Sequence, residues 1–412
     1  MGPRRRTVGA GGWLLGTDAH RNAARAGRRS SRATRASAVP ICFYGLYATV
    51  SHELVAGELG ARTIAGEYEP ALVAWVDGLA THRARASADE PILHLQRGRF
   101  ELPARELLPG LERCARLAVG GEERLVGYVE ASHGCVHHCR HCPVPTVYDG
   151  RIRVVQAETV LRDIERLAAM GARHITFGDP DFLNGRRHSL AIVRALHERV
   201  PQLTFDCTTK VEHVLEHADI WPQMAAAGCL FVVSALESVN DEILKRLDKG
   251  HTTAEAVSAI ELLRQQGIET RPSFMPFTPW TTPRDVLDIV DFVAAHDLVA
   301  NVDPVQYTIR LLVPEGSLLL NRDDLPKHLG PYQPERLSYS WHSADPAADR
   351  LQGRLSAIVQ QSAAAQEPTG PAFARIRAAV REAAGDTDGT EPQAIDIGST
   401  EGRPRLTEPW FC

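Results

Sequence analysis

The chain has 412 residues, of which 44% are hydrophobic and 24% charged, and its formal net charge is −5 at pH 7. This length is enough for two or three domains with a sizeable core, and the composition is that of an ordinary globular protein. No apolar run approaches the roughly 18 residues that a membrane span needs. Eight cysteines in a chain of this length do not make the disulfide framework of a small secreted protein. We therefore expect a cytoplasmic protein with no membrane partner.

The first 39 residues are strongly basic. They contain nine Arg, no Lys and one acid, Asp18, so this segment carries +8 and the remainder of the chain carries −13. Such an arm could bind nucleic acid or act as a transit-like peptide. The weak apolar periodicity favours a disordered arm instead, and the Arg-Ala-Gly repetition also fits a GC-rich gene read from a wrong start. We expect no nucleic-acid partner.

A short α/β fragment is predicted at residues 40–85. Strands are predicted at residues 41–45 and 61–67, and helices at residues 51–55 and 70–80. Two strands are too few to bury a sheet face alone, so the fragment either packs on the main domain or lacks its first half. Residues 86–123 are predicted to be a polar connector.

Strand and helix patterns then alternate six times over residues 124–316. Strands are predicted at residues 125–129, 174–177, 203–206, 229–233, 268–274 and 303–312, and helices at 158–170, 190–200, 211–227, 241–266 and 282–296. Six β/α units imply a parallel sheet with right-handed crossovers. The expected fold is α/β, a partial (β/α)6 TIM-type barrel, whose active-site residues follow the carboxyl ends of the strands. Residues 317–412 are predicted to form an auxiliary region with two helices.

Three cysteines stand in the loop after the first of these strands, in the sequence Gly134-Cys-Val-His-His-Cys-Arg-His-Cys142. Cysteine thiolates hold iron–sulfur clusters, and three of them leave one iron of a [4Fe-4S] cube open to a substrate or cofactor. A zinc site of three cysteines and a histidine is the alternative. Structural zinc sites usually join two ligand pairs, and the chain has no second CxxC. The pattern therefore favours a cluster bound by Cys135, Cys139 and Cys142.

This CxxxCxxC loop after the first strand of a six-fold β/α pattern resembles the radical S-adenosylmethionine superfamily over residues 125–316. The resemblance implies that S-adenosylmethionine binds the open iron and is reductively cleaved to a 5'-deoxyadenosyl radical, which abstracts hydrogen from a substrate. It also implies an external electron donor of the flavodoxin or ferredoxin type. The residue before the third cysteine is usually a larger aromatic residue that touches the adenine, and here it is His141.

The other strand ends supply candidate ligands for S-adenosylmethionine. Gly178 permits a close backbone approach and Asp179 or Asp181 can meet an ammonium group, or the segment is a plain acidic turn. Polar side chains follow the third and fourth strands, where the alternative is that they cap surface helices. These candidates are Thr208, Thr209 and Lys210 for the methionine carboxylate and, as the resemblance suggests, Ser234, Glu237 and Ser238 for the ribose. Gln306, Tyr307 and Arg310 lie on the sixth strand, and Arg310 is a candidate for an anionic group.

Both ends of the chain carry narrower resemblances. Tyr44-Gly45 with Gly66-Glu67 is similar to the second half of a cobalamin-binding-type domain, although the DxHxxG signature of many cobalamin-dependent homologues is absent. Residues 407–412 resemble the run before the tail of the CUAEP/CCAEP-tail radical SAM proteins. By this resemblance Cys412 is expected to be a redox residue that selenocysteine follows in the true product. A natural terminus, or a metal-binding or substrate-carrying tail, is the alternative.

Three readings of function remain open from the sequence. The first is a radical enzyme acting on an unidentified small molecule or peptide. The second is a cobalamin-dependent radical methyltransferase. The third is a non-catalytic iron–sulfur module that transfers electrons and never cleaves S-adenosylmethionine.

Overall fold

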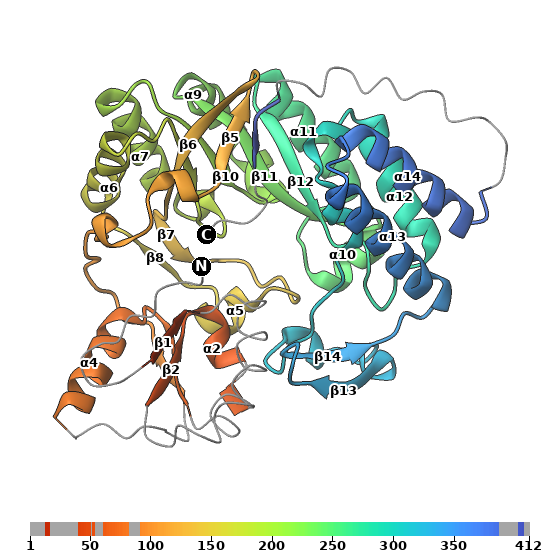
Figure 1. The fold of residues 1–412 in the computed structure, drawn as a ribbon, viewed down its shortest axis with the longest axis horizontal. Coiled ribbons are helices and arrows are strands. Elements are labelled where there is room, and N and C mark those ends of the chain that lie inside the picture. Colours follow the sequence, from red (N-terminus) through yellow and green to blue (C-terminus); the bar gives the residue numbers. More distant parts are fainter. Residues whose placement is uncertain are drawn as a thin grey trace. The chain divides into compact units, whose positions relative to one another are not determined.

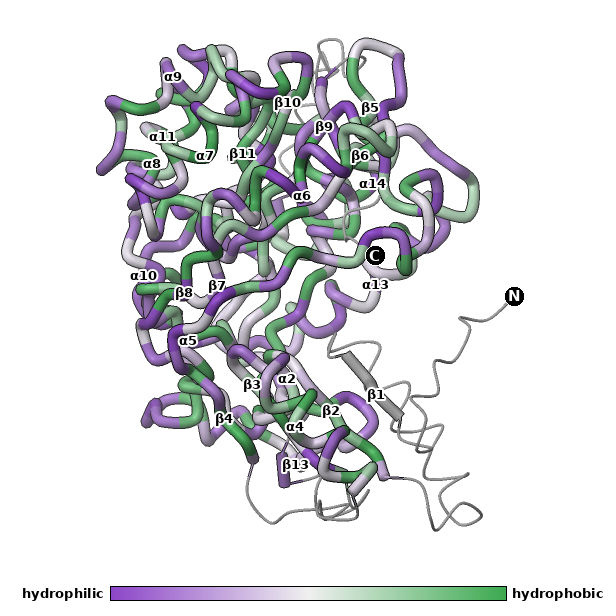
Figure 2. The backbone as a smooth tube through the Cα atoms, turned by 90° about the vertical axis from the view of Figure 1, so that its left-hand side faces the viewer, coloured by the Kyte–Doolittle hydropathy of each residue, from purple (hydrophilic) through white to green (hydrophobic). Residues whose placement is uncertain are grey.

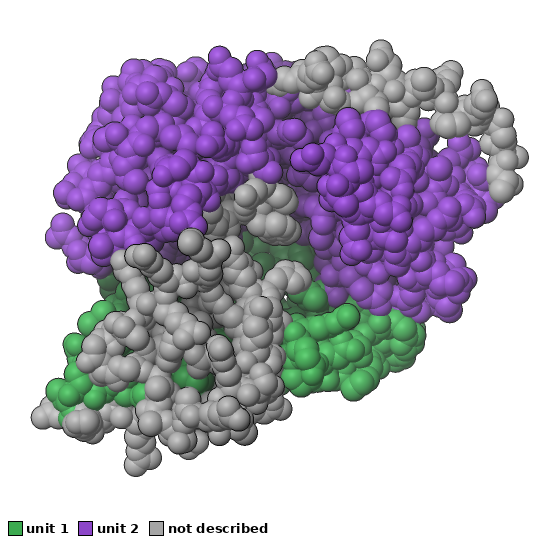
Figure 3. All heavy atoms as spheres, in the orientation of Figure 1, with its two compact units in different colours: residues 1–98, 134–151, 312–342 green, residues 99–133, 152–311, 343–412 purple. Residues whose placement is uncertain are grey.

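The computed structural model describes residues 13–16, 40–50, 52–53, 61–81, 91–386 and 403–407. The chain divides into two compact units (Figure 3). Unit 1 comprises Met1–Gly98, Gly134–Arg151 and Leu312–His342, and unit 2 comprises Arg99–His133, Ile152–Leu311 and Ser343–Cys412. Each unit therefore combines segments that are far apart in the sequence.

Unit 2 is built on a curled sheet of seven strands in the order β12-β11-β10-β9-β6-β5-β15 (Figure 1). The strands are β5 (Arg116–Val119), β6 (Glu122–Val129), β9 (His174–Phe177), β10 (Thr204–Thr208), β11 (Cys229–Glu237), β12 (Glu269–Phe274) and β15 (Arg405–Leu406). From β6 to β12 all neighbours are parallel, whereas β5 is antiparallel to both β6 and β15. The predicted α/β class with a partial barrel sheet is confirmed.

Helices connect the parallel strands, as right-handed crossovers require. They are α6 (Ala157–Ala169), α7 (Arg186–Arg199), α8 (Val211–Glu216), α9 (Trp221–Ala226), α10 (Asp241–Leu247), α11 (Thr253–Gln265) and α12 (Pro283–Ala295), and α13 (Pro346–Ala364) and α14 (Thr369–Ala383) follow them. In α6 the buried Val160, Ile164 and Leu167 recur at helical spacing and face the sheet. Two threonine capping boxes, at Thr252 and Thr282, begin α11 and α12.

Aromatic side chains from successive strands fill the core of unit 2. Phe177, Phe205 and Phe231 are fully buried, and the rings of Phe177 and Phe205 meet edge to face at 5.7 Å. Burying one such side chain stabilises the fold by roughly 1.5–3 kcal/mol. The hydrophobic residues of β10 and β11 appear green in Figure 2.

Three predicted elements differ in the structure. Residues 304–308 of the predicted sixth strand form a short 3-10 helix, and a single parallel bridge joins Phe277 to Arg310. Proline at 304 lacks the N–H that a strand ladder needs. The helix predicted at 211–227 divides into α8 and α9. The helix predicted at 241–266 divides into α10 and α11, because Asp248 and Gly250 between them have positive φ.

Unit 1 contains a parallel sheet in the order β1-β2-β3-β4. Its strands and helices are β1 (Trp13–Gly16), β2 (Ile41–Tyr44), β3 (Arg62–Gly66), β4 (Ile92–His94), α2 (Leu46–Val50), α4 (Glu69–Ala80) and α5 (Pro143–Tyr148), and the hairpin β13 (Leu329–Gln333) and β14 (Ser338–Trp341) follows. β1 falls in the predicted disordered arm and β4 in the predicted connector. Strands of four and three residues are too short to show a period.

The predicted auxiliary region is divided between the units. The β13–β14 hairpin belongs to unit 1, whereas α13, α14 and β15 belong to unit 2. β7 (Ser132–Gly134) and β8 (Ile152–Val154) flank the cysteine loop in the sequence. Within the described ranges, no helix combines the length and apolar character that crossing a membrane requires.

Candidate active site

The three clustered cysteines lie in unit 1, on the loop between β7 and α5. Cys135 and Cys139 are buried and Cys142 is half-buried, and all three are thiols, not disulfides. The backbone N–H of Cys142 donates to the carbonyl of Cys139 at 3.1 Å, which closes a tight turn between the last two cysteines. Three thiols on one short loop suit the ligand set of a [4Fe-4S] cluster that keeps one iron open.

Gly134 gives this loop its shape. Its φ is +79°, and a Cβ there would lie 2.2 Å from the carbonyl oxygen of Arg151 and 2.7 Å from the ring of Tyr148. Only glycine fits such a position without strain. The start of the loop, directly before Cys135, is thus packed against Tyr148 and Arg151 at its far end.

The segment after the cysteines packs on the small parallel sheet of the same unit. Cys135, Val144 and Tyr148 share one hydrophobic cluster with Val50 and Ala65. The hydroxyl of Tyr148 donates to Glu67 Oε1 at 3.1 Å, and Glu67 directly follows β3. The sheet and the cysteine loop therefore form one body within unit 1.

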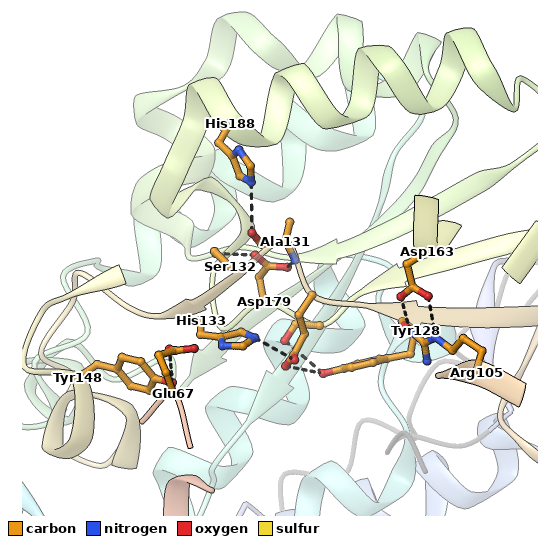
Figure 4. A network of polar contacts seen from close by, with 12 residues as sticks. Glu67, Arg105, Tyr128, Ala131, Ser132, His133, Tyr148, Asp163, Asp179 and His188 are labelled. Carbon is orange, nitrogen blue, oxygen red and sulfur yellow. Dashed lines mark hydrogen bonds and ion pairs between the residues drawn. The ribbon is translucent and has the colours of Figure 1, made fainter. Parts of the chain in front are cut away.

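In unit 2, the loop after β9 holds the end of β6. Asp179 accepts hydrogen bonds from the N–H of Ala131 at 2.9 Å and from the hydroxyl of Ser132 at 2.5 Å (Figure 4). Burial raises the pKa of Asp179 to about 6, opposed by these two hydrogen bonds. A Cβ on Gly178 would lie 2.0 Å from the hydroxyl of Tyr128. The close approach predicted at Gly178 is thus made by a tyrosine of β6.

Asp181 is fully buried and also serves the protein itself. Its carboxylate accepts from the N–H of Leu183 at 3.0 Å and from that of Lys210 at 3.3 Å, and it lies 2.8 Å from Nδ1 of His213. The ion pair with Asp181 raises the pKa of His213 against the effect of burial. Asp181 therefore ties the loop after β9 to the loop after β10.

The predicted ligands lie in or directly after β10 and β11: Thr208 and Glu237 are the last residues of these strands, and Ser234 lies three residues before the end of β11. Thr208 is half-buried, Thr209 and Lys210 are buried, and Lys210 Nζ lies 3.3 Å from Glu212 Oε2. Ser234 is buried within β11, and its hydroxyl makes no hydrogen bond to any residue that the structure describes. Ser238 caps the following turn by accepting from the N–H of Asn240.

Glu237 ends β11 in an unusual conformation. Its φ is +66°, and the register with β12 shifts between Ala235 and Glu237. The carboxylate lies 3.5 Å from Nζ of Lys249. Non-glycine residues with positive φ are strained and concentrate at functional sites.

The side chains predicted on the sixth strand have partners within the chain. Gln306 accepts from the N–H of Phe274 at 3.1 Å, and buried Tyr307 packs near Phe373 with ring centres 5.7 Å apart. Arg310 pairs with Asp349 of α13 at 2.6 Å. The prediction that Arg310 binds an anionic group of a ligand stays a prediction.

The two remaining predicted residues are His141 and Cys412. His141 is half-buried on the cysteine loop of unit 1. Cys412 lies outside the described residues, as do most of residues 1–39.

Two groups of residues escaped the prediction. Arg105, in the predicted connector, forms two contacts of 2.9 and 2.5 Å with the buried Asp163 of α6 and donates to the carbonyl of Tyr128 at 2.7 Å. Lys249 and His251 are buried beside the strand ends but stood inside one long predicted helix. A signal for them exists, since the chain has only four lysines and a glycine at 250 interrupts the helical pattern.

Comparison with known proteins finds a family match within the barrel. Residues 129–293 match the model described as the Radical SAM superfamily. The members of this superfamily are enzymes that use a [4Fe-4S] cluster and S-adenosylmethionine.

Curated relatives are distant and match only part of the chain. The ribosomal protein uS12 methylthiotransferase RimO of Porphyromonas gingivalis is 26% identical over 182 residues, which are 41% of this chain and 41% of that protein. The hopanoid C-2 methylase of Rhodopseudomonas palustris is 24% identical over 175 residues, 41% of this chain and 31% of that protein. The chain spans less than half the length of these relatives.

Two solved structures share the fold. The cobalamin-dependent S-adenosylmethionine radical enzyme OxsB, with aqua-cobalamin and S-adenosylmethionine bound, superposes with a TM-score of 0.65 at 13% identity over 85% of this chain and 58% of its own. The radical S-adenosylmethionine methyltransferase TsrM of Kitasatospora setae, with cobalamin and a [4Fe-4S] cluster bound, gives a TM-score of 0.52 at 18% identity over 69% and 59%.

Proposed function

We propose that this chain, which carries a radical SAM superfamily domain over residues 129–293, reductively cleaves S-adenosylmethionine at a [4Fe-4S] cluster and uses the 5'-deoxyadenosyl radical to abstract hydrogen from a substrate. The observation that carries the proposal is the loop of Cys135, Cys139 and Cys142, shaped by Gly134 and following the first parallel strand of a partial barrel. When bound, the cluster supplies an electron to the sulfonium.

The remaining residues are proposed to bind and orient S-adenosylmethionine. His141 would stack on the adenine, Lys210 and Thr208 would hold the methionine carboxylate, and Ser234, Glu237 and Ser238 would meet the ribose hydroxyls. The burial of Lys210, Ser234 and Glu237 at the strand ends supports this assignment. Asp179 and Asp181 would act mainly by fixing the loops, because their described contacts are to backbone groups, Ser132 and His213.

An anaerobic assay tests the cleavage. Reconstituted protein, reduced with dithionite in the presence of S-adenosylmethionine, should release 5'-deoxyadenosine, measured by liquid chromatography and mass spectrometry. Cys139→Ala should abolish the release. Cys114→Ala, which changes a half-buried cysteine outside the loop, is the matched control and should release as much as the wild type.

The competing electron-transfer module gives a different result in the same assay. If wild-type protein with full iron content and a reducible cluster releases no 5'-deoxyadenosine, the proposed cleavage of S-adenosylmethionine is wrong. We propose that the external electron donor is a flavodoxin or a ferredoxin.

A second candidate is cobalamin-dependent methyl transfer. It is favoured by the parallel sheet β1-β2-β3-β4, in which Gly45 follows β2 and Gly66 ends β3, both with positive φ. The two solved structures described above hold cobalamin. Anaerobic purification from cells supplied with hydroxocobalamin tests it: a corrinoid absorbance that copurifies with the protein in a stoichiometric amount is expected, and its absence contradicts the candidate.

Cys412 is proposed as a redox residue of the same site. Because β15 is antiparallel to β5 and β5 is antiparallel to β6, the chain at Thr407 runs in the direction of the barrel strands, toward their carboxyl ends. The mass of the native protein tests whether selenocysteine and further residues follow Cys412. A mass equal to that of a chain ending at Cys412 contradicts the tail assignment.

A further inference from the structure

The turn between α10 and α11 brings buried groups to the strand ends of unit 2. Asp248 (φ +59°) and Gly250 (φ +76°) flank Lys249 in left-handed conformations, and the N–H of Lys249 donates to the carbonyl of Leu244 at 3.1 Å. A Cβ on Gly250 would lie 2.7 Å from Glu212 Oε2 and 3.4 Å from Lys210 Nζ. The backbone of the turn is therefore packed against the ion pair that follows β10.

Lys249 holds the strained end of β11. Its side chain is only 4% exposed, and Nζ lies 3.5 Å from Glu237 Oε1. The carbonyl of Glu237 accepts from the N–H of Met275 at 2.9 Å, so the residue is fixed by β12 on its backbone and by Lys249 on its side chain. A buried lysine needs such a partner, since an isolated buried ammonium is costly.

His251 is a buried group that lacks an ordinary partner. It is 7% exposed, and among the described residues neither ring nitrogen makes a hydrogen bond of normal length, apart from a weak interaction with the backbone of Lys249. Burial and the charges of Lys249 and Lys210 lower the pKa of His251 to about 4, so the ring is neutral at physiological pH. A buried imidazole without such a partner is a candidate to bind a polar group of a ligand.

The two lysines near this histidine already have partners. Lys210 and Lys249 are each paired with a glutamate, Glu212 and Glu237 respectively, and the imidazole adds no charge. Such a site offers donors and acceptors whose charges are already paired, which suits hydroxyl groups better than a free anion.

We infer that the turn 248–251 belongs to the S-adenosylmethionine site: Lys249 is a positioning residue that aims the carboxylate of Glu237, and His251 binds the same nucleoside through its hydroxyls. The inference rests on the proposed function and extends it to two residues. Lys249 acts through Glu237, whereas His251 contacts the ligand itself.

Binding and cleavage are measured separately in the test. The dissociation constant of S-adenosylmethionine is measured by equilibrium dialysis on the reconstituted, unreduced protein, and 5'-deoxyadenosine release is measured after reduction. Lys249→Met and Glu237→Gln should each weaken binding by roughly tenfold or more, as expected for a lost hydrogen bond to a charged group. Lys249→Arg should restore most of the affinity. Lys245→Met, at an exposed position of α10, is the matched control and should bind as the wild type does.

The double variant Lys249→Met/Glu237→Gln distinguishes positioning from simple stabilisation. It removes both charges, so neither group is left buried alone, and it should bind no more weakly than either single variant. His251→Leu should weaken binding further when combined with it. Unchanged affinity in Lys249→Met or in His251→Leu at full iron content, or additive losses in the double variant, would overturn the inference. A wild type that binds S-adenosylmethionine but releases no 5'-deoxyadenosine rejects the proposed function and leaves this inference standing.

Discussion

The carboxylate of Asp179 holds the two residues that lead from β6 toward the cysteine loop. Because it is buried, its ionisation costs more free energy in the folded chain than in the unfolded one, although the hydrogen bonds from Ala131 and Ser132 recover part of this cost. The pKa of about 6, raised from 3.8, expresses this cost. The folded protein therefore keeps a proton on Asp179 at pH values where the unfolded chain has lost it.

We predict that the contribution of Asp179 to the free energy of unfolding falls as the pH rises from about 4 to 6. Asp179→Asn should abolish this pH dependence. The shift corresponds to about 3 kcal/mol at most. Anaerobic guanidinium unfolding, followed by tryptophan fluorescence between pH 4 and 8, measures it. If the difference in unfolding free energy between the two proteins does not change with pH across this window, Asp179 is not the titrating group.

Gly134 carries a second prediction at the scale of single residues. Gly134→Ala places a Cβ 2.2 Å from the carbonyl oxygen of Arg151, and the left-handed backbone alone costs at least about 1 kcal/mol for alanine. We expect a distorted loop and a clearly lower iron content after reconstitution. Gly353→Ala is the control, because that helical glycine has open space around its Cα and alanine should stabilise α13 slightly. Equal iron content in the two variants would contradict the prediction.

At the scale of elements, Arg105 ties three parts of unit 2 together. It reaches from the segment before β5 to Asp163 of α6 and to the backbone of β6 (Figure 4). The side chain of Asp163 is only 3% exposed. Removing the arginine would leave this carboxylate buried without its cation.

We therefore predict that Arg105→Ala destabilises the protein by about 3 kcal/mol. The control is Arg199→Ala, which removes exposed ion pairs with Glu158 and Glu165 of α6 and should cost at most about 1 kcal/mol. Chemical denaturation of both variants measures the difference. Similar losses in the two variants would show that burial does not set the strength of the Arg105 pair.

The elements that the sequence predicts best are those with a complete pattern of their own. α6 has apolar residues at helical spacing, and α12 has its threonine cap and first-turn proline, so both could be predicted nearly to the residue. The break between α10 and α11 depends on Asp248, a non-glycine residue with positive φ, which local propensity does not predict. β15 exists because β5 offers it an edge to pair with, and such a partner cannot be read from two residues.

The candidate site follows the same division. The cysteine loop was predictable because its spacing alone carries the chemistry. The contacts of Asp181 and Arg310 within the chain were not, because their partners His213 and Asp349 lie 32 and 39 positions farther along the chain. A charged residue at a strand end can serve a ligand or a neighbouring loop, and only the fold decides between them.

At the scale of the molecule, the sheet of unit 2 pairs its first strand in the sequence, β5, with its last, β15. β15 closes the edge beyond β5, and the N–H of Thr407 donates to the carbonyl of Arg116 at 2.8 Å. Leu406 packs into a cluster with Leu117, Val126 and Phe231. The direction of the last described residues is thus set by packing on the barrel and not by the tail itself.

We predict that Leu406→Ser releases this strand while the barrel stays folded. Losing the apolar contact removes what holds two short hydrogen-bonded residues in place, so the amides of residues 405–407 should exchange hydrogen at least about tenfold faster, a change of about 1.4 kcal/mol in local opening. Hydrogen exchange with mass spectrometry measures this, and β9 to β11 should keep their protection. Arg405→Ser is the matched control, since that neighbouring side chain is exposed and its loss should leave the exchange of Thr407 unchanged. If both variants open the strand equally, backbone pairing and not Leu406 holds the tail against the sheet.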